Sequence, residues 1–538
     1  MTGLNLKGGP MGKFGFIDLT VVVVYFAAMS IMGWYFGRRA KTTEHYFVGG
    51  RAFPGWLVGV SLFGATISSI TFVAYPADAF KTGYLRYVIC ITLPFAVLIA
   101  SRFFVPFFRR GRITSVFEYL ESRFGPRTRV YAACVFIISQ CFRISLIQFL
   151  VALLVNRITG WDVSVCILVG GVVTAYYTVV GGIEAVIWTD FVQSLILTVG
   201  GLFILAVILY RLPGGLHQML SVAWTDGKFL LNEKIADGTL KPIPWGFALS
   251  HKTVGMLLIV GLFQWLGEYS SNQENIQKYC SARSAKDARQ AIWLSCLFCV
   301  PTWGYFMFLG TGLYVFYKAF PDPAAAAMLA GTRKAEEILP YFVTTQLPPG
   351  TGGIVVAAVL AAAMSSMSSA MNSISAVAIT DLYKRHLSTG RDDTHYIRAA
   401  RGVTLASSVI MVGGAYILFK ADTMTLQDLW TEFQSIIAGG LVGLYLLGFF
   451  TKRGDGRAVG IGIAFAVLFS LFISAAGLGW LPAGVTATLN AHFDSYYTGI
   501  AGNVVMFVLG YIMALFLPRR DDNLKNLTVW TQDGLPLD

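Results

Sequence analysis

Four serines lie close together in the middle of a membrane-length apolar segment: Ser365, Ser366, Ser368 and Ser369. Residues three and four apart share one face of a helix, so Ser365 lies over Ser368 and Ser369 and the hydroxyls form a column. Hard cations prefer oxygen ligands. The column therefore indicates a site for a small cation. Close packing of membrane helices favours the same small residues, so both interpretations stay open for this stretch alone.

Two charged residues, Arg143 and Asp190, lie inside other apolar segments. A guanidinium at that depth is costly unless it meets water or a partner, and it does not usefully deprotonate. Arg143 either pairs with a buried carboxylate, such as Glu268 or Glu432, or binds an anionic ligand, for which its planar fork suits a carboxylate. Asp190, about a turn and a half into its helix, either complements the helix dipole or neutralises a bound monovalent cation.

Two apolar segments contain polar patches, Ser61–Thr71 and Trp265–Gln273. Thr, Ser and Gly weaken a helix and supply local hydrogen bonds for a broken one. Each patch lies in the first helix of a five-helix group, and the two are about two hundred residues apart. This arrangement predicts an inverted repeat with a binding site near the middle of the membrane. Two unrelated polar kinks are the alternative.

The elements that position these residues are membrane helices. The chain has 538 residues, of which 55% are hydrophobic and 13% charged, whereas a soluble chain carries about a quarter charged residues. Apolar runs near 20 residues recur along its length. We expect thirteen helices, at about 15–37, 55–80, 87–108, 131–155, 162–181, 185–210, 253–275, 289–318, 351–383, 401–420, 425–450, 458–481 and 495–517.

The net charge of +12 does not indicate nucleic-acid binding, because most basic residues lie in short loops on alternate sides of the spans. Such loops face the cytoplasm. They follow the first, third, seventh, ninth and eleventh spans. Lys278 and Arg283 are assigned to the loop after the seventh span. This pattern predicts a multi-pass protein of the plasma (inner) membrane, with the N-terminus outside and the C-terminus in the cytoplasm. Two long exterior loops, 211–252 and 319–350, are expected to hold short helices.

Several other classes of protein fit the sequence poorly. The seven cysteines form no secreted disulfide pattern, and the histidines lie in loops or at span ends, where an intramembrane haem or zinc site is not expected. No nucleophile–base constellation has a spacing that predicts an enzyme, and only about twenty residues follow the last span, too few for a sensor's output domain. A proton-coupled carrier that titrates Asp190 or Glu268 stays an alternative.

Four motifs occur in an order that resembles the sodium/solute symporter family: Gly181–Gln193, Asn272–Lys278, the serine stretch 361–373 and Leu446–Arg453. The resemblance covers about residues 15–450. It implies an all-α fold of the leucine-transporter type, with ten core helices in two inverted halves, preceded by one helix and followed by two. The expected divisions are 1–54, 55–210 (first repeat), 211–252 (exterior loop), 253–450 (second repeat) and 451–538.

The resemblance also implies the site residues. One sodium ion would be bound by the carbonyls of Gly64, Ile67 and Ala362 and the hydroxyls of Ser365 and Ser366. Some family members have a second sodium site, and all four of its ligands are present here: Asp190, Ser365, Ser368 and Ser369. One or two sodium ions are therefore expected.

The substrate residues are most similar to the sialic acid transporter branch of the family, at Thr66, Ser68, Thr71 and Arg143. The chain departs from that branch at Cys90, where sugar and sialic acid carriers place Glu or Gln. We therefore expect sodium-coupled import of a small organic solute, a carboxylate-bearing sugar such as sialic acid or another organic anion. A neutral sugar or polyol symporter is the alternative. The sequence predicts no oligomeric state.

Overall fold

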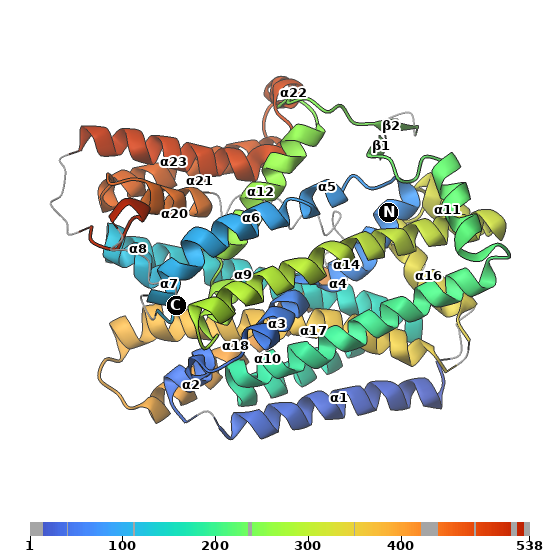
Figure 1. Ribbon diagram of the computed structural model, residues 1–538, viewed down its shortest axis with the longest axis horizontal. Coiled ribbons are helices and arrows are strands. Elements are labelled where there is room, and N and C mark those ends of the chain that lie inside the picture. Colours follow the sequence, from blue (N-terminus) through green and yellow to red (C-terminus); the bar gives the residue numbers. More distant parts are fainter. Residues whose placement is uncertain are drawn as a thin grey trace.

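The computed structural model describes residues 14–39, 41–110, 113–234, 239–348, 350–420, 440–477, 480–517 and 524–531. Within these ranges the regular structure is helical, apart from one antiparallel pair of short strands, β1 (Asn232–Lys234) and β2 (Leu240–Pro242). Figure 1 shows the long helices lying side by side along one direction of the molecule. The all-α prediction is confirmed.

The helices of the first half include two spans that are continuous in the structure. The predicted spans 162–181 and 185–210 form a single element, α10 (Val163–Arg211), in which Gly182 has φ 60° and ψ −161° and separates the two parts. The other elements of this half are α1 (Phe16–Gly37), α2 (Thr43–Val48), η1 (Gly49–Arg51), α3 (Gly55–Thr66), α4 (Ser69–Lys81), α5 (Tyr87–Cys90), α6 (Leu93–Ile99), η2 (Ala100–Phe104), α7 (Val105–Arg110), α8 (Phe117–Phe124) and α9 (Pro126–Thr159).

The second half begins after the long segment that follows α10. Most of the predicted span 425–450 lies outside the described residues, and α20 is its described part. The elements are α11 (Gly215–Thr225), α12 (Val254–Ser270), α13 (Gln273–Cys280), α14 (Ala285–Ala319), α15 (Pro323–Ala330), η3 (Ala335–Glu337), α16 (Ile338–Gln346), α17 (Gly352–Val377), η4 (Ala378–Leu387), α18 (Asp393–Lys420), α20 (Leu441–Phe450), α21 (Gly456–Gly477), α22 (Ala483–His492), η5 (Ser495–Tyr497), α23 (Thr498–Phe516) and η6 (Val529–Thr531).

Nine helices in the described part of the chain are long and apolar enough to cross a membrane, and the bent pair α3 and α4 makes a tenth candidate. The shorter apolar helices α12 and α20 add to these. Each of the thirteen predicted ranges overlaps a described helix. The number of crossings itself stays a prediction.

The predicted span at 55–80 is broken in the middle. Helices α3 and α4 are bent by 59° relative to one another. Ile67, between them, has an extended backbone with φ −85° and ψ 100°, and Ser68 is also extended. Because the helix stops at this point, the last carbonyl groups of α3 have no amide donor further along the helix, so these oxygens need other partners. The prediction of a broken helix from the polar patch Ser61–Thr71 is confirmed.

The second polar patch is also an interruption. Helix α12 ends at Ser270, the backbone leaves the helical conformation at Asn272 (φ −86°, ψ 113°), and α13 begins at Gln273. The Asn272 side chain accepts a hydrogen bond from the Glu274 amide at 2.9 Å, which caps the new helix. The two breaks occupy corresponding places in the two halves, as the inverted repeat requires.

Helix α17 lies at the centre of the bundle. Ninety-four per cent of its most apolar stretch is buried, against 28% for α1 at the surface. It packs against α10, α9, α1, α18 and α3 (Figure 1). The small residues of the serine stretch allow these helices to approach closely. The serine column therefore faces protein rather than lipid.

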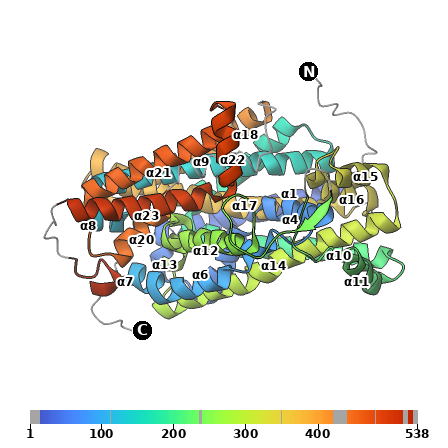
Figure 2. The ribbon, with the colours of Figure 1, turned by 90° about the horizontal axis from the view of Figure 1, so that it is seen from above.

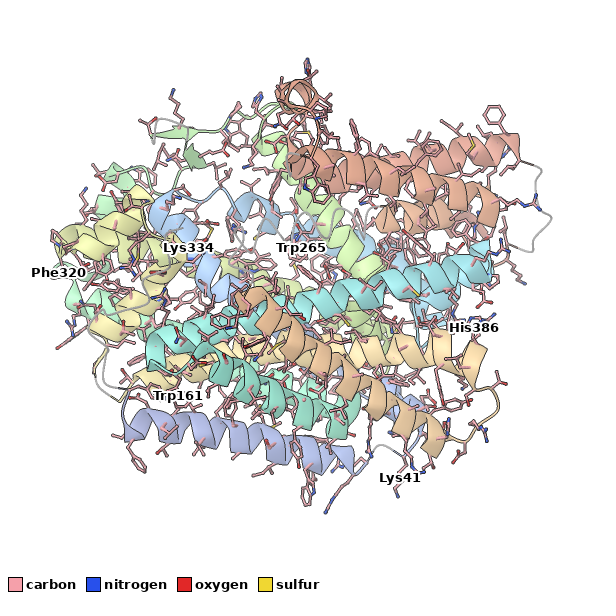
Figure 3. All side chains as sticks on the ribbon, turned by 180° about the vertical axis from the view of Figure 1, so that it is seen from behind. Lys41, Trp161, Trp265, Phe320, Lys334 and His386 are labelled. Atoms are coloured by element: carbon pink, nitrogen blue, oxygen red, sulfur yellow. The ribbon has the colours of Figure 1, made fainter. Side chains whose placement is uncertain are left out.

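Short elements cover the two ends of the helices. Figure 3 places Phe320 and Lys334 at one end and Lys41 and His386 at the opposite end, with Trp265 between them. The end that carries Phe320 also holds α11, α15 and α16, the short helices predicted for the two long loops (Figures 1 and 2). The strand pair in the first of these loops was not predicted. Helices α21 and α23 lie side by side at the edge of the bundle (Figure 2).

Candidate functional site

The serine column meets the end of α3 at the break. The Ser365 hydroxyl donates to the carbonyl oxygen of Gly64, and the Ser366 hydroxyl donates to that of Ala65, each at 2.9 Å. Both hydroxyl oxygens also lie close to the carbonyl oxygen of Ala362, at 3.2 and 3.4 Å. Several oxygens of opposite helices therefore converge in a fully buried place. Ile67, the remaining predicted ligand, is the extended residue just beyond.

Gly64 allows this close approach. A Cβ atom at this position would lie 2.5 Å from the Ser194 hydroxyl oxygen of α10. Real Cβ atoms do not come so close, so the absence of a side chain brings α3 against α10. The carbonyl of Gly64 is thereby held between α10 and α17. The structure brings Gly64, Ala362, Ser365 and Ser366 together, and their role as sodium ligands stays a prediction.

Asp190 of α10 lies beside the same column and is completely buried. Its Oδ2 accepts hydrogen bonds from Ser61 at 2.7 Å, from Ser369 at 3.3 Å and from the Lys278 ammonium at 2.8 Å. Its Oδ1 has no hydrogen-bond partner in the described part of the chain. The Ser368 hydroxyl bonds to the Ser365 carbonyl at 3.2 Å. Of the residues predicted for the second site, the structure thus brings Asp190 and Ser369 together. The positive charge beside Asp190 in this structure is that of Lys278.

Lys278 is misinterpreted in the sequence analysis. The prediction that it is one of the basic loop residues after the seventh span is wrong. Lys278 lies in α13, its side chain is 1% exposed, and its ammonium also donates to the Ser61 carbonyl at 3.0 Å. The signal in the sequence is Asn272, a residue type that caps helices, which starts the new helix α13 that carries Lys278.

Arg143 pairs with a carboxylate that the sequence analysis did not name. Its Nη1 lies 2.8 Å from Oε2 of Glu274, also in α13, and 3.4 Å from Oε1 of Gln140. Of the two partners that we predicted, Glu268 accepts hydrogen bonds from Asn272 and Asn275 instead. The other, Glu432, lies outside the described residues. Of the two alternatives for Arg143, the structure shows an ion pair with a buried carboxylate, Glu274, which we did not name. Binding of an anionic ligand stays a prediction.

The other predicted substrate residues surround the first break. Thr66 is the last residue of α3, with its hydroxyl donating to the Leu62 carbonyl at 2.8 Å. Ser68 precedes α4, and Thr71 lies in its first turn; both are buried. These positions place three hydroxyls next to the freed backbone, and their contact with a substrate stays a prediction.

An aromatic wall near Cys90 is a feature that the sequence analysis missed. The Tyr75 hydroxyl and the Cys90 sulfur are 3.3 Å apart. The Tyr75 ring stacks with Trp303 at a centroid distance of 6.5 Å, and Trp303 contacts Trp265 at 5.0 Å. The Trp265 indole donates to the Ile89 carbonyl at 3.0 Å, which fixes its orientation. The three rings come from the two halves of the chain, so no local pattern predicts them.

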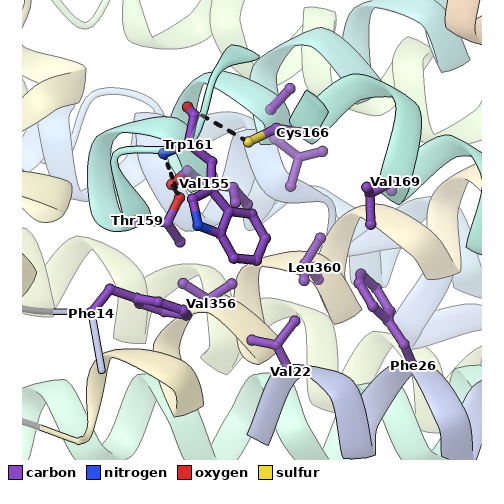
Figure 4. A pocket seen from close by; sticks show the side chains of 13 residues that line it. Phe14, Val22, Phe26, Val155, Thr159, Trp161, Cys166, Val169, Val356 and Leu360 are labelled. Carbon is purple, nitrogen blue, oxygen red and sulfur yellow. Dashed lines mark hydrogen bonds between the residues drawn. The ribbon is translucent and has the colours of Figure 1, made fainter. Parts of the chain in front are cut away.

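A separate pocket lies between α1, α9, α10 and α17 (Figure 4). Its lining is mostly apolar and includes Val22, Phe26, Val155, Trp161 and Leu360. Trp161 is held by a hydrogen bond from its own backbone amide to the Thr159 hydroxyl at 3.2 Å. None of the predicted sodium or substrate residues lines this pocket. We therefore do not connect it with the chemistry of the serine column.

Comparisons with known proteins agree with this geometry. The model of the sodium:solute symporter family matches residues 46–459. The sodium/sialic acid symporter SiaT of Proteus mirabilis (strain HI4320) is 30% identical over 515 residues, which cover 95% of this chain and 98% of the relative. The sodium-coupled monocarboxylate transporter 1 of Homo sapiens is 28% identical over 500 residues, which cover 90% and 77%.

A similar solved structure is that of a sodium-coupled sialic acid symporter in a substrate-bound, outward-open state. It matches with a TM-score of 0.83 and 29% sequence identity, over 95% of this chain and 100% of that one. The predicted leucine-transporter-type fold is confirmed.

Proposed function

The chain belongs to the sodium:solute symporter family, and from this premise we propose that it imports a small carboxylate-bearing solute together with sodium ions. Sodium coupling and a multi-pass membrane location follow from the family, which consists of transporters rather than enzymes. One observation carries the proposal: the hydroxyls of Ser365 and Ser366 meet carbonyl oxygens at the end of a broken helix.

In the proposed first site, sodium lies among these oxygens, and the hydroxyl hydrogens of Ser365 and Ser366 turn away from the carbonyls while remaining bonded to their own oxygens. The hydroxyls of Ser365 and Ser366 rotate and present their lone pairs, and the carbonyls of Gly64, Ile67 and Ala362 complete the set. All five ligands are neutral, which suits a monovalent ion with a low charge density. Because the ligands come from α17 and from the end of α3 with the residue after it, the ion adds a further link between two helices that already pack together.

In the proposed second site, sodium lies between Asp190, Ser365, Ser368 and Ser369. The unpartnered Oδ1 of Asp190 supports this assignment, because a buried carboxylate oxygen without a donor favours a cation. Each inward charge gains about 2.3 kcal/mol per 100 mV of membrane potential. An anionic substrate cancels one positive charge, so a second sodium ion keeps the transport electrogenic.

We assign the substrate site to Arg143, Thr66, Ser68 and Thr71. The guanidinium binds the substrate carboxylate as a bidentate partner, and the three hydroxyls bind its polar groups. The named relatives transport sialic acid and monocarboxylates, which share a carboxylate. At Cys90 the chain has a small thiol beside the Tyr75 hydroxyl, where sugar and sialic acid carriers place Glu or Gln. The thiol favours a substrate whose surface at this point is less polar than that of sialic acid. We therefore propose a sugar acid or another organic acid.

The proposed transport cycle is alternating access. Sodium binds at the α3–α17 junction first and stabilises the form that is open to the exterior. Sodium stabilises that form only if it binds it with higher affinity than the other forms. A site whose ligands come from two helices provides this difference in affinity, because the ligands are together only when the helices are. The substrate carboxylate then binds Arg143. Closure of the exterior side and opening of the cytoplasmic side follow.

The proposed orientation follows the basic loops. The loop after α1, the segment between α7 and α9 and the residues after η4 lie at the same end as Lys41 and His386 (Figure 3). We propose that this end faces the cytoplasm, because short basic loops remain on that side. The opposite end, with α11 and α16, then faces the exterior, and the chain begins outside and ends in the cytoplasm.

Thermal unfolding of the purified protein in sodium and in choline tests the proposal. We expect sodium to raise the midpoint and, in its presence, a carboxylate from a panel of sugars and organic acids to raise it further. A response confined to neutral sugars would refute the carboxylate assignment. Uptake into proteoliposomes that follows a pH gradient without sodium would point to a proton-coupled carrier instead.

Substitution of Arg143 tests the substrate site. In Arg143→Ala, uptake of the carboxylate found in the panel should fall by about 100-fold, on the order of 3 kcal/mol for a charge-assisted pair. The matched control is Arg157→Ala, on the same helix, whose guanidinium pairs with Glu337 at the surface. Equal uptake by both variants would make Arg143 a structural residue only.

A further inference from the structure

The short helix α13 carries both charges that neutralise the predicted ligand-binding residues. Its Lys278 pairs with Asp190, the proposed sodium ligand, at 2.8 Å. Its Glu274 pairs with Arg143, the proposed substrate ligand, also at 2.8 Å. Arg143 is 23% exposed and the other three side chains are 4% or less. We call these two contacts the α13 ion pairs.

We propose that Lys278 and Glu274 act as built-in competitors of the two transported ligands. This inference rests on the proposed function. The Lys278 ammonium supplies, at Oδ2 of Asp190, the positive charge that sodium supplies when it binds at Oδ1. The Glu274 carboxylate occupies the position that the substrate carboxylate takes at Arg143. Binding of both ligands replaces both α13 ion pairs with ligand contacts of the same sign, and α13 is released.

The sodium exchange follows from the shape of the Asp190 site. Lys278 uses Oδ2, whereas Oδ1 has no partner in the described part of the chain. Sodium at Oδ1 brings a second positive charge within a few ångström of the ammonium in a water-poor place, where repulsion is strong. Sodium binding therefore weakens the hold of Asp190 on Lys278 without ever leaving the buried carboxylate unneutralised.

The spacing of the two residues on α13 explains why both ligands are needed. Glu274 and Lys278 are four residues apart, so they share one face of the helix. A glutamate four residues before a lysine is the more favourable order for a helical ion pair. When both are displaced, they can pair with each other. When only one ligand binds, one α13 charge is displaced while the other remains engaged, and the displaced charge has no partner in a buried place.

The remaining contacts of α13 show what its release would open. Gln273 receives a hydrogen bond from the Val116 amide at 2.7 Å and donates to the Thr114 carbonyl at 2.8 Å. Gln277 donates to the Phe47 carbonyl at 2.6 Å. These contacts join α13 to the segment before α8 and to α2 itself, at the end that we propose to be cytoplasmic. Displacement of the α13 ion pairs thus loosens the closure of that end.

The test uses sodium alone, because the substrate is not yet identified. The variants are Lys278→Gln and Glu274→Gln in the full chain. Thermal unfolding of the purified protein over a sodium titration gives the half-saturating concentration, and ²²Na⁺ entry into proteoliposomes without substrate gives the leak. In Lys278→Gln we expect half-saturation at about tenfold lower sodium. In both variants we expect the leak to rise about tenfold, since each removes one condition for release.

Two further variants complete the design. Lys228→Gln removes another buried lysine, at the opposite end of the molecule, and should leave both readouts unchanged. Asp190→Asn and the double variant Asp190→Asn/Lys278→Gln should have equal sodium half-saturation, because Lys278 acts through Asp190. The double variant keeps this comparison available even if Lys278→Gln alone does not fold.

The outcomes separate this inference from the proposed function. If the wild-type protein shows no sodium stabilisation, the proposed function fails. If the wild type responds to sodium, but Lys278→Gln has the wild-type half-saturation and neither variant leaks, the function stands and the competition is refuted. An unequal response of Asp190→Asn and its double variant would also overturn it.

Discussion

Helices α4 and α13 are the second halves of the two broken spans, and they are fixed in different ways. The last turn of α4 receives Lys228, whose ammonium donates to the Phe80 carbonyl at 2.8 Å and to the Thr82 carbonyl at 3.3 Å. Helix α13 is fixed by the α13 ion pairs with Asp190 and Arg143. The lysine thus holds the end of α4 through backbone carbonyls, whereas α13 has two buried ion pairs in addition to its contacts with backbone groups.

The difference bears on which half can respond to a ligand. A helix end capped by a lysine keeps its carbonyls whether or not sodium is present, because no ligand competes for them. Ion pairs to Asp190 and Arg143 compete directly with a cation and an anion. Helix α4 does have an ion pair of its own, Asp78 with Arg86, but both side chains are about one-third exposed and neither is a predicted ligand residue. The geometry therefore makes α13 the ligand-sensitive half.

The largest expected effect separates the ion pairs of the two halves. Asp190→Asn leaves the buried Lys278 ammonium opposite a neutral amide and should lower the free energy of unfolding by about 3–5 kcal/mol. Asp78→Asn breaks a partly exposed pair of α4 and should cost about 1 kcal/mol or less. Denaturant unfolding in sodium-free detergent solution measures both. Equal losses would remove the distinction between α4 and α13.

The next effect concerns the junction at which α3 ends and α4 begins. Ser365→Ala removes a hydroxyl that reaches the Gly64 carbonyl and should reduce sodium-dependent uptake by about 100-fold, or ~2.7 kcal/mol. The control is Ser375→Ala on the same helix, where a buried hydroxyl donates to the Ala400 carbonyl at 2.8 Å. A sodium response that survives in Ser365→Ala, or is lost equally in the control, would contradict the assignment.

The third effect is a pH dependence at the end of α4. Burial lowers the pKa of Lys228 from 10.5 to about 8. Between pH 8 and pH 10 the folded protein loses this proton while the unfolded chain keeps it, so stability rises with pH, by about 2 kcal/mol for this group. A neutral amine still donates to both carbonyls. The difference in unfolding free energy between wild type and Lys228→Met should therefore grow over this range, and a constant difference would contradict it.

The sequence predicts the residues of the first break better than those of the second. The serine column depends on spacing within one helix, and the polar patch at 61–71 marks a helix interruption by its own composition. Both are local properties. The meeting of Ser365 with Gly64 is not local, and it is implied by the resemblance to the sodium/solute symporter family. The fold class is predictable from local properties, because membrane helices and their order depend mainly on hydropathy along the chain.

The charges of α13 depend on tertiary structure instead. Lys278 follows a span and precedes further basic residues, a pattern typical of a cytoplasmic loop. Its burial arises only because the chain restarts a helix at Gln273 inside the bundle. The same restart decides that Glu274, rather than Glu268, faces Arg143. A two-residue change in the position of the break would turn these side chains to another face, and hydropathy carries no information at that resolution.

The smallest expected effect tests how the two second halves begin. Helix α13 is capped by Asn272, which accepts from the Glu274 amide, whereas Ser68 before α4 makes no such side-chain bond. Asn272→Ala should lower the free energy of unfolding by about 1 kcal/mol, and Asn272→Ser, which retains a capping oxygen, by clearly less. Ser68→Ala should lose no capping energy. Unfolding is measured without sodium or substrate, because Ser68 is a proposed substrate residue. Under these conditions the free energy of unfolding reports the capping contributions alone. If Ser68→Ala costs as much as Asn272→Ala, the helices begin with equal support, and only the ion pairs distinguish α13 from α4.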